Sequence, residues 1–245
     1  MSKEKKESVQ LFFCLIPETL INPHLRRVSE RYPSVEAGIY PAHGTLTVVL
    51  HSSDRANLNA FQKELTSQFG NYLFSTHSGK IEEALHEWFV KHKKTLAFAE
   101  SCTGGMLSMH VTAVPGASEY FLGSFVVYSN AMKQQVLGVA KETIDSQGAV
   151  SEAAVKEMLD AVFKKTSADF AIAVSGIAGP TGGTEQKPVG TICAAMGERG
   201  KPSDVGTFKA LGNRHTITLL TTQWLLGALW RKAEKGIPAF PLLPS

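Results

Sequence analysis

Cysteine is scarce in this sequence, and the three cysteines that it contains lie far apart. Cys14, Cys102 and Cys193 show neither the paired spacing of a metal site nor a disulfide framework. We therefore expect reduced thiols. The eight histidines also lack an HExxH or similar spacing of ligands. The sequence thus predicts neither a bound metal nor another cofactor.

Long apolar runs and a large net charge are missing as well. No window approaches the roughly 18 apolar residues of a membrane span, and the charged start MSKEKKESVQ lacks the apolar core of a signal peptide. The formal net charge is only +3, and the basic run KHKK at 91–94 has no interleaved aromatic residues, which indicates a solvated helix end. We expect a cytoplasmic protein that binds neither membranes nor nucleic acid.

What the sequence does contain is an alternation of strand and helix patterns. Its 245 residues, 43% of them hydrophobic, can form one large domain or two smaller ones. Strand-like runs at 10–16 and 42–50, each followed by a helical pattern, predict a small α+β domain over 1–78. The polar stretch STHSG marks its end. Over 79–245 the alternation predicts a three-layer α/β/α sandwich with a largely parallel sheet.

Two helices are the most clearly specified. An apolar stripe at helical spacing follows Ser151, a residue suited to cap the start of a helix. The segment 214–232 is apolar on most sides, which predicts a deeply packed helix. Both patterns indicate core contacts rather than a ligand site.

Two glycine-rich turns each follow a short apolar strand: ESCTGG at 100–105 and SGIAGPTGG at 175–183. Ligands of α/β sheets bind at the carboxyl ends of strands, where helix N-termini offer unpaired N–H groups to anions. Glycine permits close approach of the backbone, and hydroxyls add donors. Because neither turn matches a P-loop or a dinucleotide fingerprint, an anion site and a plain tight turn both remain open.

The stretch AESCTGG leaves four alternatives: a thiol nucleophile, a hydroxyl nucleophile, a phosphate site or a plain turn. No histidine lies near Cys102 in sequence to activate its thiol, so we expect Cys102 to be buried and to point away from a ligand. Ser101 is a candidate nucleophile, because nucleophiles often lie at strand-to-helix turns. We expect Thr103, Gly104 and Gly105 to open a helix N-terminus toward an anion.

A third stretch, PGASEYFLGSFVVYSNAMK at 115–133, brings Ser118, Tyr128 and Lys133 close together in sequence. A serine and a lysine form a hydrolase pair when the amine is unprotonated and accepts the hydroxyl proton. Free lysine titrates at about 10.4, so Lys133 can be the base only in a dry or positively charged site. The alternative is a surface lysine and an N-capping serine. A short-chain dehydrogenase is excluded, because its Y-x-x-x-K spacing is one residue shorter.

Five segments together resemble the CinA C-terminal domain, the family of bacterial nicotinamide-nucleotide amidohydrolases. They are AESCTGG, PGASEYFLGSFVVYSNAMKQQVLGV, GAVSEAAV, SGIAGPTGGTEQKPVGT and GNR, ordered and collinear over about residues 80–232. The preceding segment resembles the small KH-type domain of full-length CinA proteins. It contains no GxxG loop to clamp a nucleic-acid backbone, so we expect a structural or dimerisation unit.

The resemblance implies an activity. It implies hydrolysis of the carboxamide of nicotinamide mononucleotide (NMN) to nicotinate mononucleotide and ammonia, as in NAD salvage, by a metal-independent Ser/Lys mechanism in a homodimer. The alternative is a nucleotide-binding protein without turnover, associated with competence or DNA damage.

The resemblance also implies roles for particular residues. Ser118 would be the nucleophile, with Ser101 as its rival, Lys133 the general base, and Tyr128 a partner that orients or protonates. The substrate-binding residues that it implies are Thr103, Gly104, Gly105, Ser175, Gly176, Gly179 and Arg214. Ser175 stands where the family usually has threonine, so the hydroxyl is kept and a methyl group is lost.

Overall fold

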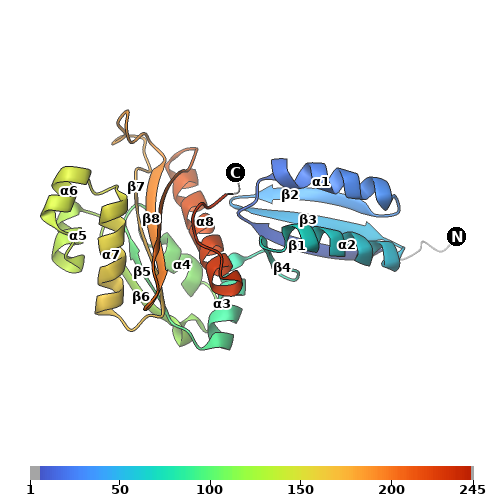
Figure 1. Ribbon diagram of the computed structural model, residues 1–245, viewed down its shortest axis with the longest axis horizontal. Coiled ribbons are helices and arrows are strands. Elements are labelled where there is room, and N and C mark those ends of the chain that lie inside the picture. Colours follow the sequence, from blue (N-terminus) through green and yellow to red (C-terminus); the bar gives the residue numbers. More distant parts are fainter. Residues whose placement is uncertain (1–5, 244–245) are drawn as a thin grey trace. The chain divides into compact units, whose positions relative to one another are not determined.

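A computed structural model describes residues 6–243 of the chain (Figure 1). The chain divides into two compact units between Ala84 and Leu85, a few residues beyond the boundary predicted after residue 78. Each unit has its own sheet and its own hydrophobic core. Helix α3 (Ile81–His92) begins just before the division.

The first unit has the order β-α-β-β-α-β. Its elements are β1 (Glu7–Cys14), α1 (Glu18–Arg31), β2 (Glu36–Ala42), β3 (Thr45–Ser52), α2 (Arg55–Phe69) and β4 (Leu73–Ser75). All neighbouring strands are antiparallel in the order β2-β3-β1-β4, a ferredoxin-like arrangement. Alternate residues of β3 are buried, so one face of the sheet packs into the core with both helices. The small α+β unit is confirmed, whereas its KH-type character stays a prediction.

The second unit contains a five-stranded sheet in the order β6-β5-β7-β8-β9. Its strands are β5 (Leu96–Glu100), β6 (Phe121–Val126), β7 (Phe170–Gly176), β8 (Thr191–Glu198) and β9 (Asp204–Lys209). Its helices after α3 are α4 (Met106–Thr112), α5 (Asn130–Leu137), α6 (Lys141–Gln147), α7 (Glu152–Lys165) and α8 (Arg214–Lys235). Figure 1 shows α7 on one face of this sheet and α8 on the other, the layers that the sequence predicted.

The sheet of the second unit is mixed. Strand β5 pairs in parallel with β6 and β7, whereas the β7–β8 and β8–β9 pairs are antiparallel. The prediction of a largely parallel sheet therefore holds for the first three strands only. Strands β7 and β8 are joined by a loop without a crossover helix, and such a connection makes neighbouring strands antiparallel.

Burial explains why these segments form these elements. Strands β5 and β7 are buried on both faces, as their continuous apolar runs require. Helix α7 begins at Ser151, whose Oγ accepts a hydrogen bond from the N–H of Ala154 (3.2 Å), and its apolar stripe is buried. In α8 every residue from Leu225 to Arg231 is buried. Even so, no helix within residues 6–243 has the length and apolar character of a membrane span.

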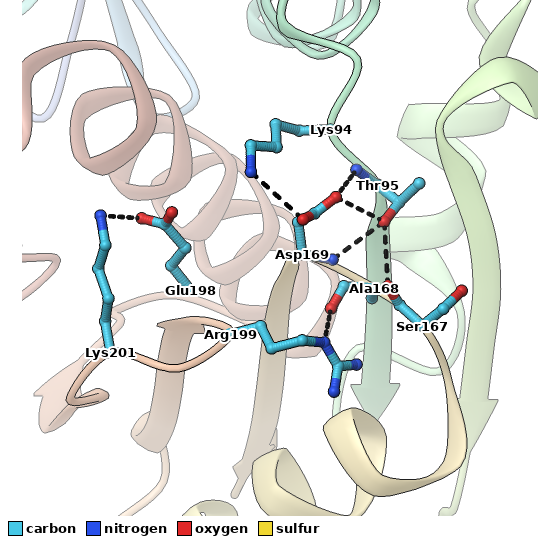
Figure 2. A network of polar contacts seen from close by, with 8 residues as sticks. All are labelled: Lys94, Thr95, Ser167, Ala168, Asp169, Glu198, Arg199 and Lys201. Atoms are coloured by element: carbon cyan, nitrogen blue, oxygen red, sulfur yellow. Dashed lines mark hydrogen bonds and ion pairs between the residues drawn. The ribbon is translucent and has the colours of Figure 1, made fainter.

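Asp169 joins the amino ends of β5 and β7. Its Oδ2 accepts hydrogen bonds from the N–H (2.9 Å) and Oγ1 (3.0 Å) of Thr95, and its Oδ1 accepts one from Nζ of Lys94 (3.3 Å; Figure 2). The N–H of Asp169 donates to Oγ1 of Thr95 (3.0 Å) in return. These contacts hold the register of the parallel pair, so that the carboxyl ends of β5 and β7 lie side by side.

Candidate functional site

A cavity of about 330 Å³ opens at the carboxyl ends of β5 and β7. Its walls come from these strand ends, the segment after β6, the α6–α7 connection, the loop after β7 and the start of α8. The lining residues are Ser101, Cys102, Tyr128, Asn130, Lys133, Ala149, Val150, Ser175, Gly176, Ile177, Ala178, Gly179, Thr181, Gly182 and Arg214. Its place is the usual ligand position of α/β sheets, and its volume lies within the range of small-molecule sites.

Two of the lining residues, Lys133 and Ser101, contact each other. Its Nζ lies 2.9 Å from Oγ of Ser101, 3.0 Å from the carbonyl oxygen of Val127 and 3.1 Å from that of Tyr128. The side chains of Lys133 and Ser101 are 1% and 6% exposed. A buried lysine and a buried serine hydroxyl are therefore in direct hydrogen-bond contact.

Burial governs the charge of Lys133. Within residues 6–243 no carboxylate forms an ion pair with Nζ of Lys133. Loss of hydration disfavours the ammonium form, which lowers the pKa of Lys133 below its ordinary value of 10.5. Lys133 thus lies in a site largely shielded from water, which is one of the two conditions for it to act as a base.

The register of the sheet explains why these groups meet. Glu100 lies beside Val126 in the parallel β5–β6 pair, and the N–H of Val127 donates to the carbonyl oxygen of Glu100 (2.8 Å). Ser101, which follows β5, and Val127, which follows β6, therefore lie at the same end of the two strands. Helix α5 then begins, capped by Ser129. Its buried residue Lys133 lies at the same end of the strands, in contact with Ser101.

Ser118 lies at the other end of the sheet. It falls in a short 3-10 turn, Ala117–Glu119, immediately before β6, and its side chain is exposed. Because β6 runs parallel to β5, the start of β6 and the end of β5 are separated by a strand length, roughly 20 Å for six residues. The expectation that Lys133 lies beside Ser118 is therefore corrected: the hydroxyl beside Lys133 is that of Ser101.

Cys102 lines the cavity, contrary to the expectation that it points away from a ligand. Its side chain is nonetheless almost wholly buried, and burial raises the pKa of its thiol to about 12. The thiol is therefore protonated at neutral pH, and thiolate is the nucleophilic form of cysteine. The alternative of a thiol nucleophile loses its chemical basis.

Glu100 occupies the N-terminus of α4. Its fully buried carboxylate accepts hydrogen bonds from the N–H groups of Gly105 (3.1 Å), Leu107 (3.0 Å) and Ser108 (3.1 Å), and from Oγ of Ser108 (2.6 Å). These donors are the ones that a helix start leaves without partners. The chain's own carboxylate thus takes the position that the sequence assigned to a bound anion.

Three predicted binding residues consequently lie outside the cavity. Thr103, Gly104 and Gly105 are not among its lining residues, and the side chain of Thr103 is 4% exposed. Both glycines have positive φ, +59° and +98°, which the tight turn between β5 and α4 requires. These residues shape the turn after Ser101 instead of binding an anion, because the Glu100 carboxylate already fills the helix N-terminus behind them.

A guanidinium also lines the cavity. Arg214, the first residue of α8, donates from Nη1 to the carbonyl oxygen of Gly179 (2.9 Å) and from Nη2 to the hydroxyl of Tyr128. Tyr128 is largely exposed and lies at the cavity rim. Besides Lys133, whose charge burial disfavours, Arg214 is the one basic residue that lines the cavity in the described part of the chain, and no carboxylate there lines it. The cavity therefore favours an anionic ligand.

The structure brings the remaining predicted residues to the same cavity and adds others. Ser175, Gly176 and Gly179 line it, with Ser175 1% exposed. The α6–α7 connection contributes Ala149 and Val150. Their aliphatic side chains have no reactive or polar group that would mark them as site residues in the sequence. The only signal for them was the segment GAVSEAAV in the family resemblance. Among residues 6–243, no three His, Cys, Asp or Glu side chains gather as metal ligands would.

Comparison with known proteins identifies relatives along most of the chain. A CinA-like protein of Thermotoga neapolitana is 39% identical over 212 residues, which cover 85% of this chain and 52% of that protein. A CinA-like protein of Thermotoga maritima is 41% identical over 187 residues, 75% of this chain and 46% of that protein. The chain thus spans about half the length of the curated relatives it matches.

Solved structures resemble the second unit. The crystal structure of competence damage-inducible protein A from Klebsiella pneumoniae has a TM-score of 0.60 and 34% identity over 62% of this chain and 94% of its own. The competence/damage inducible protein CihA of Agrobacterium tumefaciens has a TM-score of 0.59 and 34% identity over 63% and 96%. The family model named CinA C-terminal domain matches residues 78–232. The chain therefore belongs to the CinA C-terminal domain family.

Proposed function

We propose that this protein is an amidohydrolase that converts NMN to nicotinate mononucleotide and ammonia, with Ser101 as nucleophile and Lys133 as general base. The observation that carries the proposal is the set of three contacts at Nζ of Lys133. A neutral amine has two hydrogens and one lone pair. Two of the three neighbours are backbone carbonyls, which only accept. When Lys133 is neutral, both hydrogens go to Val127 and Tyr128, and the lone pair faces Ser101.

The first half of the reaction forms an acyl-enzyme. Lys133 takes the proton of Ser101 as Oγ bonds to the carboxamide carbon. The tetrahedral intermediate then collapses, its C–N bond breaks, and the Lys133 ammonium returns the proton to the leaving nitrogen, which departs as ammonia. Burial supports this step, because it keeps the resting amine unprotonated at a lower pH than in a free lysine.

The second half of the reaction releases the acid. A water molecule takes the place of ammonia and gives a proton to Lys133 as its oxygen attacks the ester carbon. The C–Oγ bond breaks, the proton on Lys133 returns to Ser101, and the second proton of the water is released to solvent as nicotinate mononucleotide leaves as a carboxylate. One water is consumed, and each group returns to its starting state.

The charge of the cavity supports a nucleotide as substrate. The phosphate of a mononucleotide is an anion, and Arg214 presents a guanidinium to the cavity, with hydrogen-bond donors beyond the two already used. The loop after β7 also lines the cavity and adds the hydroxyl of Thr181. We assign phosphate binding to Arg214 and a substrate-contacting role to Ser175.

The alternative is a nucleotide-binding protein without turnover that is associated with competence or DNA damage. The names of the relatives with solved structures refer to competence and damage. Such a binder gains nothing from a lysine that is buried without a counter-ion, because burial of an unpaired charge costs free energy. The contact of Lys133 with Ser101 is the observation that favours the enzyme. Isothermal calorimetry distinguishes the two, since a binder shows uptake of NMN and no continuous heat of turnover.

The decisive experiment compares two serine variants in an ammonia-release assay with NMN. We expect Ser101→Ala to lower kcat at least about 10³-fold, because the nucleophile is lost. Ser118→Ala is the matched control and should retain activity within about twofold, because Ser118 lies at the far end of the sheet. Loss of activity in S118A with S101A active would contradict the assignment, and absence of turnover in the folded wild-type protein would overturn the function.

A further inference from the structure

The loop between β7 and β8, residues 177–190, is closed at its base and near its tip. At the base, the N–H of Gly190 donates to the carbonyl oxygen of Ile177 (2.7 Å). Near the tip, the N–H of Thr184 donates to the carbonyl oxygen of Lys187 (2.9 Å), and the N–H of Lys187 donates to Oγ1 of Thr184 (3.0 Å). The loop therefore has a defined conformation, with Lys187 at the end of its turn.

Val189 fills the inside of this loop. A Cβ on Gly179 would lie 2.6 Å from Cγ1 of Val189, and a Cβ on Gly183 would lie 2.8 Å from its backbone nitrogen. Glycine at both positions therefore lets the chain fold around the valine. The loop is thus packed on itself, and hydrogen bonds to neighbouring segments add to what holds it.

Lys187 provides such a contact with the α6–α7 connection. Its Nζ donates to the carbonyl oxygens of Gln147 and Val150, both at 2.6 Å. Gln147 ends α6, where carbonyls lack helical partners and a cation is favoured by the helix dipole. The connection is itself held, since Oγ of Ser151 donates to the carbonyl oxygen of Gly148 (2.8 Å) and caps α7.

Both segments that Lys187 joins line the cavity. The α6–α7 connection contributes Ala149 and Val150, and the start of the loop contributes residues between 177 and 182. We propose that Lys187 is a positioning residue, which holds the loop against the α6–α7 connection and thereby sets the width of the substrate cavity. It does not line the cavity and touches no reacting atom. The kinetic consequence rests on the proposed function, whereas the structural consequence is measurable without substrate.

The test uses three variants of the full chain. Lys187→Met keeps the length of the side chain and removes its donors, whereas Lys187→Arg restores donors that reach two carbonyls. Lys156→Met is the matched control, because it removes a lysine whose hydrogen bonds go to Asp160 of the same helix, α7. Amide hydrogen exchange of residues 182–187 is measured first, without substrate. We expect about tenfold faster exchange in K187M, recovery in K187R and no change in K156M.

Kinetics with NMN form the second measurement. We expect K187M to raise KM about tenfold with kcat within about twofold, K187R to restore KM, and the pH profile to stay unchanged in all three variants. Unchanged loop exchange in K187M, or faster exchange with an unchanged KM, would overturn the proposal. So would faster exchange throughout the second unit that K187R does not reverse, since this indicates a general loss of stability. If the wild type has no turnover, the proposed function fails, and the exchange data still decide whether Lys187 holds the loop.

Discussion

At the scale of single residues, the chemistry of this cavity depends on what each buried group has as a neighbour. Ser101 and Cys102 are adjacent and both are buried. The hydroxyl of Ser101 has the amine of Lys133 at 2.9 Å, whereas burial holds the thiol of Cys102 in its protonated form. Intrinsic nucleophilicity would have favoured the cysteine. The available proton acceptor favours the serine.

The pH dependence of activity should report the amine of Lys133. Because burial lowers the pKa of Lys133 in the folded protein, its free amine is populated at a lower pH than in an exposed lysine. We expect kcat/KM to rise with pH through an apparent pKa below 10.5 and to level off above that pKa. We expect Lys133→Met to be at least about 10²-fold slower at every pH. Steady-state kinetics across the pH range measure this.

The charge of Lys133 should also make the stability of the fold depend on pH. The unfolded chain binds the Lys133 proton more tightly than the folded one, so the ammonium costs folding free energy at low pH. This cost is relieved as the pH rises through the folded pKa toward 10.5. Lys133→Met should therefore fold at least as stably as the wild type at neutral pH, and a slow variant that is also unfolded would contradict the assignment.

Arg214 should distinguish substrates by their phosphate. We expect Arg214→Ala to lower kcat/KM for NMN by about 10- to 100-fold, because charge-assisted hydrogen bonds to the phosphate are lost. With nicotinamide riboside, which lacks the phosphate, the same variant should differ from the wild type by no more than about twofold. Arg199→Ala is the control, since the guanidinium of Arg199 is bonded to the carbonyls of Thr166 and Ala168. An equal loss with both substrates would contradict phosphate binding.

At the scale of elements, hydrogen bonds at strand ends and helix starts position the catalytic pair. The Glu100 carboxylate holds the start of α4 and so shapes the turn that carries Ser101. At the other end of β5, the contacts of Asp169 with Thr95 and Lys94 join β5 to β7 (Figure 2). The reacting groups are thus held from both ends of one short strand.

The Asp169 contacts should stabilise the fold in a pH-dependent way. Burial alone would raise the pKa of Asp169, but hydrogen bonds from Thr95 and Lys94 outweigh it and lower the pKa below 3.8. The contribution is then fully present above the unfolded pKa and is lost as the pH falls through the folded pKa. We expect Asp169→Asn to reduce the free energy of unfolding by about 1 kcal/mol at pH 7, with the difference shrinking below about pH 4.

Urea unfolding of the full chain at several pH values measures this difference. Asp160→Asn is the matched control, because Asp160 pairs with Lys156 on the exposed side of α7 and such pairs contribute less than about 0.5 kcal/mol. A difference between D169N and the wild type that persists unchanged at acid pH would refute the role of the carboxylate charge.

At the scale of the whole molecule, the homodimer implied by the family resemblance stays a prediction. Strand β6 is at the edge of its sheet, and Leu122 and Val126 on it are 46% and 45% exposed. An edge strand with exposed apolar residues is a surface suited to pairing with another chain. We expect light scattering to give twice the mass of one chain, and Leu122→Lys with Val126→Lys to halve it. Leu211→Lys, which changes an exposed leucine elsewhere, should leave the mass unchanged.

The local features of the fold were predictable because they depend on neighbouring residues in the chain. Apolar runs predict β5 and β7, Ser151 and the stripe after it predict α7, and the apolar segment from residue 214 predicts α8. The candidates Ser101, Lys133 and Arg214 could be named from residue type and family resemblance. The antiparallel direction of β8 and β9 could not be predicted from the sequence, because strand direction depends on how the chain returns to the sheet.

Which groups meet was decided by the tertiary structure alone. Ser118 is closer to Lys133 in sequence, but Ser101, 32 residues away, is the one in contact with it. Parallel pairing of β5 with β6 puts the residues that follow the two strands side by side, and it leaves Ser118, in the turn before β6, at the opposite end of the strands. The sequence by itself determined the elements and the chemical groups. The sheet determined which serine hydroxyl contacts the amine of Lys133, because contacts between distant segments follow from strand direction and register.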